Sequence, residues 1–172
     1  MVTEGDLSWM LMLSGMVGVE MSEAMEDEHL RFQIYRRTLR DVKETEEEQV
    51  LGIIGRDSDA TMGEAAVVEY VDAIGATETD YEAFRTKTRK ILQAVPEFDF
   101  LARRVDEWEV ALRSATDAER VLEAILGGTD WLQRKLANES VSRTVLAALA
   151  TEGRTKRVRN GARERCGTLG LA

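Results

Sequence analysis

The sequence predicts an all-α protein of about eight helices, and three observations support this class. One proline in 172 residues is very few, whereas all-β folds need frequent turn residues. No segment shows the sustained apolar alternation with a period of two that a half-buried strand requires. Apolar residues instead recur at helical spacing along most of the chain. We therefore expect helices joined by short connections and no sheet.

The first 50 residues predict one long amphipathic helix. Eleven positions follow one another at steps of four and three, and most are apolar: Leu7, Leu11, Ser14, Gly18, Met21, Met25, Glu28, Phe32, Tyr35, Leu39 and Val42. Such a heptad stripe is typical of a helix that packs along its length on another helix. We expect residues 1–50 to be a packing or oligomerisation spine, with Leu7, Leu11, Met21, Met25, Phe32, Tyr35 and Leu39 as its interaction residues.

Charge changes sign along this segment. The segment before Arg31 contains acidic residues and no lysine or arginine. Residues 31–43 hold five basic residues and one acid, and four acids follow between Glu44 and Glu48. Two antiparallel copies would place acidic and basic stretches side by side, whereas parallel copies would oppose like charges. Self-association would therefore be antiparallel. The alternative is that both stretches are solvated faces.

Capping signals divide residues 57–172 into a compact multi-helix bundle. Gly52 and Gly55 end the first segment. Later helices begin at a threonine three residues before a glutamate, or at the proline, and several end at glycine. The expected helices cover 61–74, 79–95, 96–112, 116–127, 129–136, 140–153 and 154–167. We expect one structural domain.

The last 22 residues reverse the charge of the chain. Net charge is −9, and the first 150 residues hold 17 basic and 30 acidic residues. Residues 151–172 hold two acids and six basic residues: Arg154, Lys156, Arg157, Arg159, Arg163 and Arg165. Charge asymmetry of this kind marks an interaction segment. Val158, Ala162, Cys166 and Leu169 give 154–167 the apolar edge of an amphipathic helix.

Three interpretations of this basic helix stay open. It can neutralise the acidic surface of its own chain or of a second copy, it can bind an acidic protein, or it can contact nucleic acid. Arginine binds phosphate bidentately and phosphate contacts dominate affinity for nucleic acid. Base stacking is not expected, because no aromatic residue lies within the segment.

A metal site is a weaker hypothesis. Glu26 and His29 have the Glu-x-x-His spacing that ferritin-like di-iron proteins use twice. His29 is the one histidine of the chain, so a second pair cannot form. Glu26 and His29 are therefore weak candidates, and we expect no metal ligand, cofactor or catalytic residue, since no nucleophile elbow or phosphate loop occurs either.

The first hypothesis is a non-enzymatic helical interaction protein, an adaptor, scaffold or regulatory subunit that self-associates through residues 1–50. The alternatives are a nucleic-acid-associated protein and a carboxylate-rich metal enzyme. A single cysteine excludes an internal disulfide, and the apolar stretch from Leu7 lacks a basic region before it and is too short to span a bilayer. We expect a cytoplasmic, prokaryotic protein without membrane contact. An excess of arginine over lysine indicates high-GC coding or a halophilic source.

Overall fold

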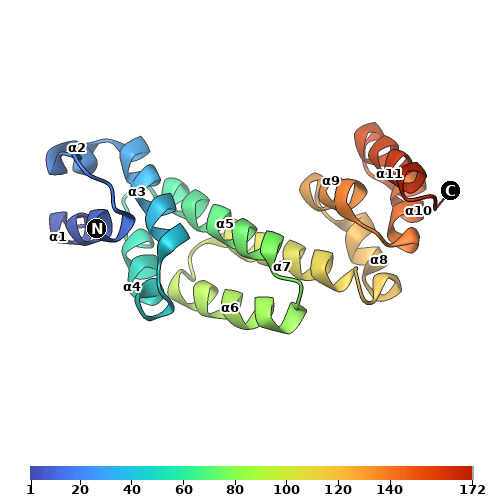
Figure 1. Cartoon of the computed structure of the whole chain (residues 1–172), viewed down its shortest axis with the longest axis horizontal. Coiled ribbons are helices and arrows are strands. Elements are labelled where there is room, and N and C mark those ends of the chain that lie inside the picture. Colours follow the sequence, from blue (N-terminus) through green and yellow to red (C-terminus); the bar gives the residue numbers. More distant parts are fainter. Residues whose placement is uncertain (172) are drawn as a thin grey trace. The chain divides into compact units, whose positions relative to one another are not determined.

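The computed structural model describes residues 1–171, and these residues form helices and no strand. The predicted all-α class is confirmed, but the count of about eight helices is wrong, because eleven lie within the described residues (Figure 1). Their bounds are α1 Glu4–Ser14, α2 Met21–Glu26, α3 Glu28–Asp41, α4 Glu44–Ile54, α5 Ala60–Thr77, α6 Tyr81–Ala94, α7 Asp99–Arg113, α8 Ala118–Gly127, α9 Asp130–Glu139, α10 Arg143–Glu152 and α11 Lys156–Thr168.

The helices divide into two compact units. Unit 1 comprises Met1–Glu78 and Glu82–Val105, and unit 2 comprises Thr79–Tyr81 and the chain from Asp106 onward. This division differs from the boundaries expected from the sequence, which separated residues 1–50 from 57–172. Each unit has its own buried apolar residues.

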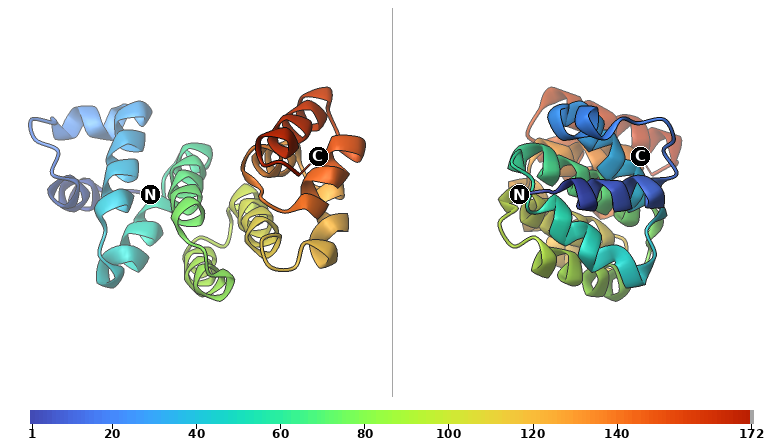
Figure 2. Two further views of the ribbon diagram at one scale, coloured as in Figure 1. Left: turned by 45° about the vertical axis from the view of Figure 1, so that its right-hand side comes forward. Right: turned by 90° about the vertical axis from the view of Figure 1, so that its left-hand side faces the viewer.

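The expected long N-terminal helix is four helices, α1 to α4 (Figure 2). The first break follows Ser14, where Gly15 and Gly18 have φ angles of 63° and 78°. This left-handed conformation is strained for residues with a side chain but open to glycine, so the two glycines end α1 and redirect the chain. The small residues of the heptad stripe therefore mark a helix end.

Asp27 makes the second break, between α2 and α3. Its backbone is extended, and its Oδ1 accepts hydrogen bonds from the N–H groups of His29 at 2.8 Å and Leu30 at 3.3 Å. An aspartate that caps a new helix in this way satisfies N–H groups that lack helical partners. Val42 and Lys43 are also extended and separate α3 from α4. Heptad spacing persists across these breaks, which is why it predicted one helix.

The later helices lie close to their expected positions, although some caps differ. Asp59, not Thr61, caps α5 by accepting a hydrogen bond from the N–H of Met62 at 2.9 Å. Glu64 of α5 instead accepts from the N–H groups of Phe100 and Leu101, at 2.7 and 3.0 Å, in the first turn of α7. The expected capping box is thus replaced by a contact between two helices.

In unit 1, α3 packs against both α1 and α5, and its inner face is fully buried. A buried polar cluster joins this helix to the loop before α5. The Oδ2 atom of Asp57 accepts hydrogen bonds from Arg31 Nε at 3.0 Å and from the Tyr35 hydroxyl at 2.5 Å. Oδ1 accepts from the N–H of Asp59 at 2.8 Å. Both oxygens of the buried carboxylate are therefore satisfied, as burial of a charge demands.

In unit 2, α11 packs on α9 and α10, and α10 also packs on α8 (Figure 1). The core between these helices is apolar. It is formed by Val121, Ile125, Leu132, Leu136, Ala137, Val145, Leu146, Leu149, Val158 and Ala162. Burial of these side chains drives the association of four short helices that would be unstable alone in water.

Replacing Asp57 by Asn should destabilise unit 1 strongly. The change keeps the shape of the side chain but leaves the guanidinium of Arg31 buried without its counter-charge, which costs about 3–5 kcal/mol in comparable buried pairs. The Arg31 and Asp57 side chains are 10% and 1% exposed. Urea denaturation followed by circular dichroism measures the change in the free energy of unfolding.

Asp41→Asn is the matched control. Asp41 also pairs with an arginine, Arg40 at 3.3 Å, but the two side chains are 54% and 67% exposed. We expect a change below about 0.5 kcal/mol, since exposed pairs contribute little. Equal effects of the two substitutions would contradict a stabilising role of the buried cluster.

Candidate functional site

The basic C-terminal segment forms α11, which is seated on unit 2 by an apolar edge. Thr155 caps the helix, and its hydroxyl accepts a hydrogen bond from the N–H of Val158 at 3.2 Å. Val158 and Ala162 are buried, and Cys166 and Leu169 are half-buried against the same core. The opposite face of α11 is therefore the one that meets solvent.

Three of the six basic side chains hold this helix in place. Arg159 Nη1 donates to the carbonyl of Gly153 at 2.5 Å, Arg163 Nη2 to Ala150 at 2.7 Å, and Arg165 Nε to Ser140 at 3.3 Å. These carbonyls lie at the C-terminal ends of α10 and α9, where carbonyl groups lack partners within their own helix. Cationic side chains also interact favourably with the negative end of a helix dipole. These arginines therefore act as helix caps.

The other three basic residues, Arg154, Lys156 and Arg157, are exposed at the start of α11. In the part of the chain that the structure describes, none of the six basic side chains forms an ion pair with a carboxylate. Neutralisation by the described acidic residues of unit 2 therefore gains no support. We call Arg154, Lys156 and Arg157 the basic patch.

A buried glutamine sets the position of the basic patch. The Gln133 side chain is fully buried, and its Nε2 donates to the carbonyls of Ile125 at 3.0 Å and Leu126 at 2.7 Å, at the end of α8. Its Oε1 accepts from the N–H of Arg154 at 2.8 Å. One amide thus ties the turn before α11 to the end of α8, and the patch is presented on an ordered backbone.

The interaction residues expected from the N-terminal stripe separate into two groups. Leu7, Tyr35 and Leu39 are at most 1% exposed and belong to the core of unit 1. Leu11, Met21, Met25 and Phe32 are half-buried and reach the surface of α1, α2 and α3. Only the second group is open to another chain, and self-association through it stays a prediction.

Glu26 and His29 do not share a helix face. Glu26 is the last residue of α2, His29 lies in the first turn of α3, and the extended Asp27 separates them. Both are exposed. Within residues 1–171, no group of three or more histidine, cysteine, aspartate or glutamate side chains is placed to hold a metal ion. The Glu-x-x-His spacing therefore has no ligand set around it in this structure.

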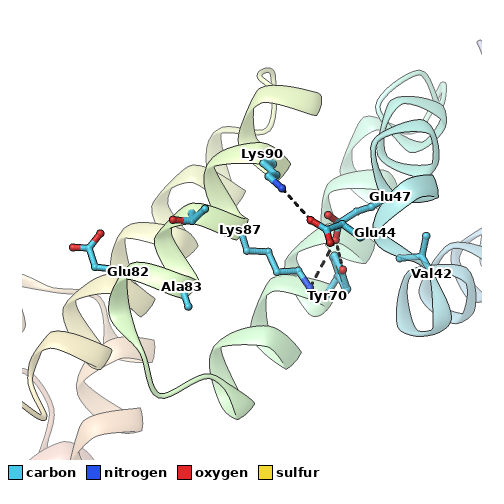
Figure 3. A pocket seen from close by; sticks show the side chains of 9 residues that line it. Val42, Glu44, Glu47, Tyr70, Glu82, Ala83, Lys87 and Lys90 are labelled. Carbon is cyan, nitrogen blue, oxygen red and sulfur yellow. Dashed lines mark hydrogen bonds and ion pairs between the residues drawn. The ribbon is translucent and has the colours of Figure 1, made fainter.

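Sequence reasoning missed a polar pocket of about 500 Å³ between α4, α5 and α6 (Figure 3). Glu47 of α4 lines the pocket and accepts a hydrogen bond from the hydroxyl of Tyr70 on α5. Lys87 Nζ on α6 lies 4.0 Å from Glu47 Oε1 and 5.5 Å from the centre of the Tyr70 ring. Lys90 Nζ lies 3.1 Å from Glu44 Oε1. No local motif could predict the pocket, because its residues come from three helices.

Four of the five charged residues that line this pocket are paired, and the fifth is the exposed Glu82, which limits the chemistry of the pocket. Glu47 already has both a hydroxyl donor and a lysine beside it, and Glu44 pairs with Lys90. Burial, and then the hydrogen bond to Glu47, raise the pKa of Tyr70 well above its ordinary value. The phenol therefore stays protonated at neutral pH and serves as a hydrogen-bond donor. We assign the cluster a structural role that joins α4, α5 and α6.

Comparisons with known proteins give this chain no relatives: no family model, curated protein or solved structure matches it. Within residues 1–171, no helix is both long and apolar enough to cross a membrane.

Replacing Tyr70 by Phe should make stability less sensitive to alkaline pH. The folded-state pKa of Tyr70 is raised, while in the unfolded chain it is about 10. Above about pH 10 the unfolded state loses this proton and the folded state keeps it, so stability falls by up to about 1.4 kcal/mol per pH unit for one tyrosine. Urea denaturation of both proteins from pH 8 to 11.5 measures this loss.

The difference in the free energy of unfolding between wild type and Tyr70→Phe reports on Tyr70 alone, because the other titrating groups are common to both proteins. This difference should be constant below about pH 9, and above about pH 10 the wild type should lose stability relative to the variant. Identical pH dependence of the two proteins would show that the Tyr70 hydroxyl is not held by Glu47.

Proposed function

We propose that this chain is a helical interaction protein, an adaptor or scaffold whose unit 2 binds the phosphate backbone of nucleic acid through α11. The observation that carries the proposal is the basic patch: three exposed cations at an ordered helix start, to which no carboxylate of the described residues is paired. Arginine and lysine at such a position bind phosphate oxygens by charge-assisted hydrogen bonds.

The composition of the outer face favours nucleic acid over a protein partner. The exposed residues of Lys156–Thr168, all within the described chain, include no apolar or aromatic side chain: Lys156, Arg157, Asn160, Arg163, Glu164, Gly167 and Thr168. A stable protein interface needs buried apolar or aromatic anchors at its centre. Phosphate contacts need only well-placed donors and positive charge. Without an aromatic residue to stack on bases, the face suits a duplex better than a single strand.

The acidic character of the rest of the chain limits this contact to α11. The net charge of −9 repels nucleic acid elsewhere, so we expect weak binding over a short stretch of duplex. Three phosphate contacts predict a slope of about −2.7 for the logarithm of the binding constant against the logarithm of salt concentration. Affinity should then fall about 40-fold between 50 and 200 mM salt.

The triple substitution Arg154→Ala, Lys156→Ala and Arg157→Ala should abolish this binding and its salt dependence. Fluorescence anisotropy with a labelled 20-base-pair DNA duplex, repeated with an RNA duplex, measures the affinity of the full chain at several salt concentrations. The matched control is the triple substitution of Arg85, Arg89 and Arg103 by Ala. These arginines are exposed in unit 1, and their removal changes the net charge by the same amount. Equal weakening by both triple variants, or no binding by wild type at 50 mM salt, would contradict the proposal.

Self-association through the N-terminal helices is a second proposal, independent of the first. Met12 and Val17 are 71% and 95% exposed, and Leu11, Met21, Met25 and Phe32 of α1, α2 and α3 are half-buried. Apolar side chains that reach the surface are available for protein contacts, and a second copy is the expected occupant.

Light scattering on a size-exclusion column tests this second proposal. Wild type should elute with about twice the 19.3 kDa mass of one chain, and the triple substitution of Met21, Met25 and Phe32 by Ser should give monomers. Val141→Ser is the control, because Val141 is 66% exposed but lies in unit 2. A wild-type protein that is monomeric at all concentrations would exclude self-association.

A further inference from the structure

Unit 1 has an open groove between α3 and α5 that neither the basic patch nor the N-terminal stripe explains. Its volume is about 910 Å³, and it is lined by α3 from Gln33 to Arg40 and by α5 from Ala66 to Thr77. The groove lies wholly within unit 1, between two helices that pack directly against each other.

The two walls of the groove differ in charge. The α3 wall carries three exposed arginines, Arg36, Arg37 and Arg40, whereas Glu69 is the one charged residue that α5 contributes. Arg36 pairs with Glu69 across the groove and lies over the ring of Phe32, 5.4 Å from its centre. Arg40 is 3.3 Å from Asp41 in an exposed pair, which is worth little. Arg37 forms no ion pair among the described residues. The α3 wall therefore keeps a net positive charge, carried by Arg37 and by Arg40 in its weak exposed pair.

The floor of the groove is apolar. Leu39 and Ala66 are each 1% exposed and form its base. Ala73 is exposed and Ile74 is half-buried further along α5. Because alanine is small, the backbone of α5 is open to close approach by another element. An apolar floor below a charged wall is the geometry that accepts an amphipathic helix.

We propose that this groove binds an acidic amphipathic helix of a partner protein. The apolar face of that helix rests on Leu39, Ala66, Ala73 and Ile74, and its acidic edge faces Arg37 and Arg40. The opposite edge, beside Glu69, is uncharged or basic. The charge difference between the two walls thus fixes the direction in which the acidic edge points.

The length of the groove sets the length of the bound helix. Eleven residue steps separate Ala66 from Thr77 on α5, which at 1.5 Å per residue is about 16 Å, or three helical turns. The bound segment is therefore about 11–14 residues long, with apolar residues at spacings of three and four and acids along one edge.

Nucleic acid fits this groove less well than it fits α11. A phosphate backbone makes no use of the apolar floor, and the carboxylate of Glu69 would repel it. The groove and the basic patch are both positively charged, but only the groove has apolar surface beside the charge. We therefore expect them to bind different partners.

A designed peptide tests the proposal with the full chain. The probe is a labelled 14-residue peptide with leucine at positions three and four apart, glutamate along one edge and alanine elsewhere, its helicity checked by circular dichroism. A second peptide with lysine in place of glutamate has the same apolar face. Fluorescence anisotropy should show that wild type binds the glutamate peptide at least about tenfold more tightly than the lysine peptide.

Two variants locate the binding site. Arg37→Glu with Arg40→Glu should weaken binding of the glutamate peptide about tenfold or more, and Ala73→Trp should weaken binding of both peptides by filling the groove. Arg85→Glu with Arg89→Glu is the control for charge, and the thermal midpoint of each variant shows that it is folded. Binding that is equal for the two peptides, or that falls equally in both charge variants, would overturn the proposal. The proposal would also be overturned if a second copy of the chain occupied the groove. In that case wild type would be a dimer, and the variant with Arg37→Glu and Arg40→Glu would be a monomer.

Discussion

The carboxylate of Asp57 is the contact on which the arrangement of unit 1 depends. It lies between α4 and α5 in sequence, yet its partners Arg31 and Tyr35 belong to α3. Arg31 also donates to the carbonyl of Met25 at 2.8 Å, in the last turn of α2. One buried carboxylate therefore connects α2, α3 and the start of α5. This connection ties α3 to the start of α5, the two helices that line the groove, while the apolar core supplies most of the free energy of folding.

Arginine has two roles in this protein, and hydrogen-bond partners within the fold separate them. Arg31, Arg159 and Arg165 are at least partly buried and donate to specific carboxylate or carbonyl oxygens within the fold. Arg37, Arg154 and Arg157 are exposed and remain available to a ligand. The same side chain suits both roles, because its planar guanidinium carries several donors in a fixed geometry. A count of basic residues in a segment cannot distinguish the roles, whereas hydrogen-bond partners can.

The sequence predicts the helical class and most helix positions after residue 60, because capping residues and apolar spacing are local signals. It does not predict the breaks before residue 50. Gly15, Gly18 and Asp27 are compatible with a continuous heptad pattern, and only their backbone conformations show that α1, α2 and α3 are separate. The candidate sites depend on longer-range contacts. Arg31 and Asp57 are 26 residues apart, and the pocket around Glu47 combines three helices. No spacing rule relates such positions.

Gln133 should slow the hydrogen exchange of one backbone amide in unit 2, that of Arg154. Its amide bridges the end of α8 and the N–H of Arg154, and the side chain is excluded from water. The hydrogen on that backbone nitrogen is bound to an acceptor in the core of unit 2. Its exchange with deuterium requires this bond to open, so the amide should exchange more slowly than other amides of surface turns.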